Sequence, residues 1–133
     1  MLRNYADLYR EARQQPEPQR FLFVFCRVEL PEDASEAERQ AFARGEGGAL
    51  TPVVCVDKLP SDVPDFAGLV KESETTGQAW DMVFVAAMSG RAGFPPSADE
   101  AQQPMSMMVE AVRMGSVGNF LAMNRAGEFV ALN

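Results

Sequence analysis

The feature that most constrains the fold is an apolar run at residues 82–88, which no polar side chain interrupts. The run is rich in Val and Ala, and it is too short for a buried helix of ordinary length. It is closed by residues 89–96, which contain glycines and prolines and are expected to form a flexible loop. A short apolar run bounded in this way is typical of a strand covered on both faces. We therefore predict a central strand inside a sheet that helices cover.

Three further segments have strand patterns, at residues 20–30, 50–56 and 120–132. The first begins apolar on both faces and then alternates between apolar and charged residues, which predicts that one of its faces meets water. The last is predicted to be a β-hairpin, because Gly127 suits the left-handed position of a three-residue turn. Its final strand is expected at an edge of the sheet.

Helices are predicted around these strands, at residues 4–15, 35–44, 61–77 and 97–114. Two of them begin with Ser followed three residues later by Glu, which is the spacing of a capping box. The final helix carries a stripe of methionines and valines at helical spacing, and Pro104 can open or restart it. We expect this stripe to be core, and the alternative is an adaptable binding surface.

The order of these elements predicts an α/β or α+β fold in a single domain of residues 1–133. The connections at residues 31–49, 57–78 and 89–118 are each long enough for a crossover that contains a helix. Alternating strands and helices favour a mixed, mostly parallel sheet of about five strands, with helices packed on it in three layers and a hairpin at the C-terminus.

The composition limits the partners that the chain can have. The net charge is −7, and the 12 basic residues are scattered along the sequence. Contact with nucleic acid or with an anionic membrane surface is not expected, because both need clustered Lys and Arg. Residues 1–7 lack the apolar core of a signal peptide, and no apolar run has the length of a membrane span. A cytoplasmic location is therefore expected.

In that compartment Cys26 and Cys55 are expected to be thiols, each buried as a small hydrophobe within its apolar run. Histidine is absent from the sequence. This excludes nucleophiles activated by His, imidazole general bases and His metal ligands. We therefore predict no metal site and no cofactor.

A candidate site follows from the predicted parallel strands, whose C-terminal ends would meet at one edge of the sheet, where ligands of open α/β sheets usually bind. The residues expected at that edge are Glu29, Asp57, Lys58, Ser89, Gly90, Arg91 and Gly93. Lys58 and Arg91, close to backbone N–H groups, would hold a carboxylate or a phosphate. The alternative is a solvated rim of loops with ordinary surface ion pairs.

Four stretches carry a resemblance: Gln-Pro-Glu-Pro-Gln-Arg at 15–20, Gly-Glu-Gly-Gly-Ala-Leu-Thr-Pro-Val at 45–53, Cys-Val-Asp-Lys at 55–58 and Val-Phe-Val-Ala-Ala at 83–87. Over nearly its whole length the chain is similar to a family of small uncharacterised bacterial proteins. Some members carry the label ribonucleotide reductase subunit alpha. The residues do not support that label, because such an enzyme needs a long catalytic barrel and a redox cysteine pair. The resemblance implies no catalytic residue.

Two functions are compatible with these residues. The first is a non-catalytic cytosolic binding or interaction protein, which self-associates through the hairpin or the Met-rich helix. The second is a small-molecule or anion-binding protein, or an enzyme, that uses the loop edge. Catalysis there would need Asp57 or Glu29 as acid or base and Lys58 or Arg91 as an electrostatic partner. Cys55 would be the nucleophile, on the same face of its strand as Asp57.

Overall fold

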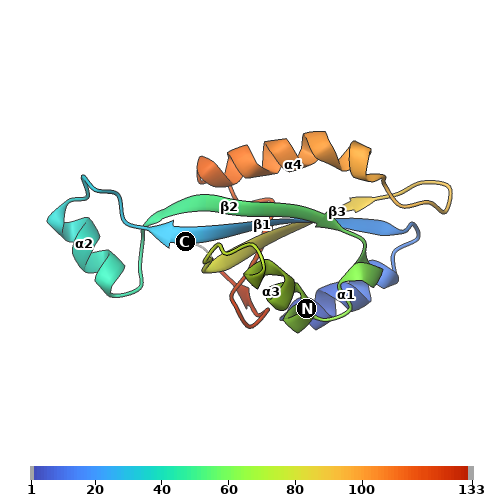
Figure 1. Ribbon diagram of the computed structural model, residues 1–133, viewed down its shortest axis with the longest axis horizontal. Helices are drawn as coiled ribbons and strands as arrows, with labels where there is room; N and C mark the ends of the chain where they lie inside the picture. Colours follow the sequence, from blue (N-terminus) through green and yellow to red (C-terminus); the bar gives the residue numbers. More distant parts are fainter. Residues whose placement is uncertain (1, 132–133) are drawn as a thin grey trace.

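The computed structural model describes residues 2–131, which form a single sheet with helices on both faces (Figure 1). The elements within these residues are α1 (Tyr5–Arg13), β1 (Gln19–Glu29), α2 (Glu36–Ala43), β2 (Ala49–Lys58), η1 (Pro60–Asp62), α3 (Phe66–Glu74), β3 (Met82–Ser89), α4 (Ala98–Arg113), β4 (Leu121–Met123) and β5 (Phe129–Val130). The predicted C-terminal hairpin is confirmed, since β4 and β5 pair antiparallel.

Every pair of neighbouring strands in this sheet is antiparallel. The order is β2-β1-β3-β4-β5, so β1 lies between β2 and β3. The expectation of a mostly parallel sheet is therefore wrong, and the fold is α+β. β2 and β3 do run in the same direction, since each is antiparallel to β1, but they are not neighbours. The lengths of the connections could not reveal this, because a long connection can also return to an antiparallel neighbour.

The side chains of β1 alternate between two hydrophobic cores, one on each face of the sheet. The odd-numbered residues from Phe21 to Phe25 pack with buried side chains of α1 and α3. The even-numbered residues from Leu22 to Cys26 pack with α4. Figure 1 shows α4 on one side of the sheet and α1 with α3 on the other. Because both faces are covered along residues 21–26, this part of the strand is apolar without interruption.

The core beneath α1 and α3 is aromatic and includes two polar atoms that are hydrogen-bonded. The hydroxyl of Tyr5 donates to the carbonyl oxygen of Val63 at 2.7 Å. Burial raises the pKa of the Tyr5 hydroxyl well above its ordinary value. The indole Nε1 of Trp80 donates to Ser73 Oγ at 2.8 Å. A buried donor without a partner is costly, so both contacts fix how α1 and α3 sit on the sheet.

The core beneath α4 contains the predicted stripe. The buried residues of the helix are Ala101, Met105, Met108 and Val112, spaced along one face. Pro104 lies inside the helix and neither opens nor restarts it. Met107 and Met114 are exposed, so the wider set of methionines is divided between core and surface.

The helix α2 contrasts with the others because it buries no residue. It begins at a capping box formed by Ser35 and Glu38, as predicted. It lies beyond the end of the β1–β2 pair, away from α1, α3 and α4 (Figure 1). Residues 30–48 therefore form an arm that projects from the body of the protein.

The two cysteines differ in their surroundings. Cys26 is buried beneath α4, as expected, but Cys55 is exposed, so the prediction of burial was wrong for it. Cys55 lies on β2, which has a neighbour on one side only. Within residues 2–131, no helix has both the length and the apolar character that a membrane crossing needs.

Candidate functional site

Six of the seven residues expected at the predicted edge, all except Glu29, lie at one end of the sheet. Lys58 at the end of β2 is opposite Phe21, and Ser89 at the end of β3 is opposite Gln19. The start of β1 therefore separates the two strand ends. Glu29 lies at the other end of the sheet, opposite Ala49, so it cannot share a site with them.

The faces of the sheet divide these residues. Asp57 is opposite Leu22, on the face that α4 covers, whereas Lys58 is opposite Phe21, on the face of α1 and α3. Adjacent residues in a strand point to opposite faces. Asp57 and Lys58 therefore do not converge on one ligand.

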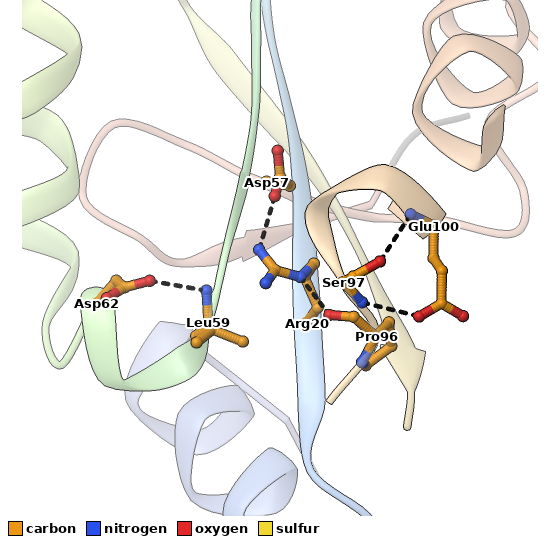
Figure 2. Close-up of polar contacts among 7 residues, drawn as sticks. All are labelled: Arg20, Asp57, Leu59, Asp62, Pro96, Ser97 and Glu100. Carbon is orange, nitrogen blue, oxygen red and sulfur yellow. Dashed lines mark hydrogen bonds and ion pairs between the residues drawn. The ribbon is translucent and has the colours of Figure 1, made fainter. Parts of the chain in front are cut away.

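Asp57 belongs to a contact that joins three segments of the chain. Arg20 Nη1 lies 2.7 Å from Asp57 Oδ2, and Arg20 Nε donates to the carbonyl oxygen of Pro96 at 2.6 Å (Figure 2). The side chain of Arg20 is only 14% exposed. This guanidinium connects β1, β2 and the residues just before α4, which is a structural role.

The two cations of the predicted ligand site are also paired. Lys58 Nζ lies 2.6 Å from Glu72 Oε1 on α3. Arg91 Nη1 lies 3.2 Å from Glu100 Oε2, although the Arg91 side chain is 85% exposed. The N–H of Ser97, and then the Arg91 guanidinium, hold the pKa of Glu100 below its ordinary value. Figure 2 shows Glu100 closing the capping box with Ser97 at the start of α4.

The segment after β3 is a tight turn instead of the flexible loop that was expected. The backbone N–H groups of Arg91 and Phe94 each donate to the other residue's carbonyl oxygen at 3.0 Å. The central residues, Ala92 and Gly93, have φ values of 55° and 83°. Positive φ at both positions is typical of a two-residue hairpin turn. Residues 91–94 are called the 91–94 turn below.

Two distant residues fix this turn to the body. The N–H of Gly90 donates to the carbonyl oxygen of Pro18 at 2.8 Å, and the N–H of Gly93 donates to Glu17 Oε1 at 2.8 Å. A Cβ at Gly90 would lie 1.9 Å from the carbonyl oxygen of Phe94. Gly90 is therefore needed for this close backbone approach, and its role is packing.

The 91–94 turn stands beside two hollows. The smaller has a volume of about 310 Å³ and is lined by Ser89, Gly90, Arg91, Ala92, Phe94, Pro95, Pro96 and Glu100. The larger is an open groove of about 610 Å³, and Pro95 lines both. Three of the predicted site residues, Ser89, Gly90 and Arg91, thus line one hollow, while Asp57 and Lys58 line neither.

The groove was missed by the sequence interpretation. It lies between α1, the α1–β1 connection and η1, and its lining includes four prolines and Tyr9. The guanidinium of Arg13 lies 5.5 Å from the centre of the Tyr9 ring. The available signal was Gln-Pro-Glu-Pro-Gln at residues 15–19, which had been used only as part of a resemblance and not as a sign of a groove.

The thiols offer little support for nucleophilic catalysis. Burial raises the pKa of the Cys26 thiol to about 12, so it stays protonated and inaccessible. Cys55 does share a face with Asp57, as predicted, because they are opposite Val24 and Leu22. Asp57, however, is already paired with Arg20.

Within residues 2–131 no group of three or more Cys, Asp or Glu side chains is arranged to hold a metal ion. No protein-family model, curated protein or solved structure matches the chain. Its function therefore has to be argued from the geometry of its own surface.

Proposed function

We propose that this protein is a non-catalytic binding module that contacts another protein through the 91–94 turn. One observation carries the proposal: the turn presents Phe94, 73% exposed, next to Arg91 on a backbone that hydrogen bonds hold in place. Most large apolar side chains of the described residues lie in the two cores. An exposed Phe ring on a fixed turn is therefore interpreted as a contact residue.

The chemistry of the turn suits protein recognition. Aromatic and Arg side chains are enriched among the residues that dominate interface energies. A fixed backbone lowers the ordering cost of binding, because the contact residues are already in place. Ala92 adopts a positive φ that costs a non-Gly residue energy, which the surrounding hydrogen bonds offset. The groove and the smaller hollow provide concave surfaces on either side of Pro95.

The experiment compares two side chains with the same exposure. Phe94→Ala removes the ring from the turn, and Met114→Ala removes an equally exposed side chain at the end of α4, since both residues are 73% exposed. A partner is isolated from lysate with the wild-type protein, purified, and titrated with each variant by calorimetry. We expect a loss of at least about tenfold in affinity for Phe94→Ala and little change for Met114→Ala. Equal affinities for wild type and Phe94→Ala contradict the proposal.

The second candidate is an anion in the smaller hollow, favoured by the exposed guanidinium of Arg91 in its lining. Four of the backbone N–H groups at this turn, those of Gly90, Arg91, Gly93 and Phe94, already donate to protein oxygens. A bound anion would also have to compete with Glu100 for Arg91. This interpretation stays a prediction, and a ligand screen of wild type and Arg91→Ala tests it.

A further inference from the structure

The outer edge of β2 is the longest free edge in the described part of the sheet. β2 is one end of the strand order and has 10 residues, whereas β5 at the other end has only two. Along a free edge, every second residue points its backbone N–H and C=O groups away from the sheet. The group that satisfies such an edge best is another extended backbone.

This edge lacks most of the features that discourage strand addition. Residues 49–56 carry no charge. The two charged residues that follow form ion pairs within the subunit. Asp57 pairs with Arg20, and Lys58 pairs with Glu72. Protection is confined to the Ala49 end, where Pro52 lacks an N–H and the register with β1 shifts. The half of the strand from Val53 onward is therefore open to pairing.

The arm is a second and independent feature. Its helix α2 has 8 residues and buries none of them on its own subunit. Isolated helices of this length are marginal in water, so packing normally stabilises them. In Figure 1 the arm extends past the Ala49 end of β2, where no other helix of this chain is near. A surface from outside the subunit would supply the missing contact.

We propose that β2 pairs antiparallel with β2 of a second copy, about a two-fold axis near Cys55. A two-fold axis places the same surface on both sides of the interface, so each edge satisfies the other. In this arrangement the arm of each copy lies beyond the Lys58 end of its partner's strand, close to η1. It also puts the two α4 helices on the same face of a continuous sheet.

The charges along the edge do not oppose a second copy as the occupant. Two chains that each carry −7 repel one another, and this repulsion is weakest where the contact surface is neutral. Residues 49–56 are uncharged, and Asp57 and Lys58 are each paired with an opposite charge of their own subunit. Antiparallel pairing therefore brings no like charges face to face across the strands.

The first test measures mass in solution. Sedimentation equilibrium of the full chain over the micromolar range should give twice the 14.6 kDa of one chain. Cys55→Lys places two like charges beside the axis without disturbing the core, because Cys55 is exposed. This variant should sediment as a single chain with unchanged circular dichroism. Met114→Lys, the matched control for added charge on an exposed residue, should stay a dimer.

The second test uses the native thiol and does not depend on how a variant folds. Mild oxidation should join two wild-type chains through Cys55, and Cys55→Ser should abolish this band on a non-reducing gel, since Cys26 is buried. A single-chain mass at all concentrations overturns the proposal. So does a dimer that survives Cys55→Lys or that forms no Cys55 cross-link. Phe94→Ala should remain a dimer, so this proposal and the proposed function fail separately.

Discussion

The helices α2 and α4 begin with the same local motif, but they differ in how they pack. Each starts with a Ser that caps the backbone N–H of a Glu three residues later, and the Glu accepts from the backbone N–H of the Ser. Yet α4 buries four residues on the sheet, while α2 buries none and stands off the body. A capping box therefore sets where a helix begins, and the apolar stripe behind it decides whether the helix packs.

The stripe differs because the two sequences differ in side-chain size along one face. α4 places Ala101, Met105, Met108 and Val112 at helical spacing. The sequence of α2, Glu-Ala-Glu-Arg-Gln-Ala-Phe-Ala, has Phe42 as its only large apolar residue. Burial of large side chains supplies most of the stabilisation of a packed helix. We expect perturbations under α4 to destabilise the whole protein and perturbations of α2 to have local effects.

The largest expected effect comes from Phe84→Ala. Phe84 is fully buried on β3, in the core beneath α4. Removal of its ring leaves a cavity in that core, so the free energy of unfolding should fall by about 3–5 kcal/mol in urea denaturation. Phe42→Ala on α2 is the control, with an expected loss of less than about 1 kcal/mol when both variants carry Cys55→Lys. Similar losses for the two variants would remove the distinction between the helices.

The capping boxes provide the next test, because the same substitution can be made in both. Ser97→Ala should lower the free energy of unfolding by about 1 kcal/mol. Ser35→Ala should change it by less than about 0.5 kcal/mol, and should instead speed amide hydrogen exchange within residues 36–43. Both are measured in the Cys55→Lys background, so that a second copy does not stabilise the arm. Equal losses would place α2 in the cooperative core.

The pH dependence of stability should distinguish the same two motifs. The Ser backbone N–H lowers the pKa of Glu38 and of Glu100. A carboxyl whose pKa is lower in the folded protein stabilises it above the ordinary value of 4.5, and this contribution is lost as the pH falls through the folded pKa. Wild type should therefore lose more stability than Glu100→Gln on acidification below pH 4.5. When all the proteins compared carry Cys55→Lys, so that no second copy contacts the arm, Glu38→Gln should follow the profile of the protein that keeps Glu38 and Glu100. A profile like that of Glu100→Gln would show that α2 unfolds with the body.

The smallest expected effect concerns Arg91, next to the capping box of α4. Its side chain is 85% exposed, so Arg91→Ala should change the free energy of unfolding by less than about 0.5 kcal/mol. A thermal-shift screen of wild type against phosphates, nucleotides and carboxylic acids tests the anion interpretation. If a ligand is found, loss of the guanidinium should weaken its affinity about tenfold to a hundredfold. If a ligand binds wild type and Arg91→Ala with the same affinity, it does not bind at this site.

Much of the candidate site could be placed from the sequence, although for an incomplete reason. Asp57 and Arg91 were expected at one end of the sheet because their strands were predicted to be parallel. They do share that end, because β2 and β3 are both antiparallel to β1. The expectation could not include Arg20, which lies between those strands and pairs with Asp57. The opposite orientation of Asp57 and Lys58 follows from their being adjacent in a strand, but the predicted strand ended at residue 56, whereas β2 continues to Lys58.

The sequence by itself determined the local elements of this protein. Apolar runs without polar interruption specify β1 and β3, capping boxes specify where α2 and α4 begin, and Gly127 specifies the final hairpin. These signals act within a few residues, through backbone conformation and the spacing of side chains. They are therefore visible in the chain before it folds.

The tertiary structure alone decided the direction of the strands, the exposure of Cys55 and the rigidity of the 91–94 turn. The turn is held by Pro18 and Glu17, which are far from it in sequence. Cys55 is exposed on the edge strand β2, and the direction of β2 follows from its antiparallel pairing with β1. Each of these properties depends on contacts between segments that are far apart in the sequence. Such contacts form only when the helices and the sheet pack together.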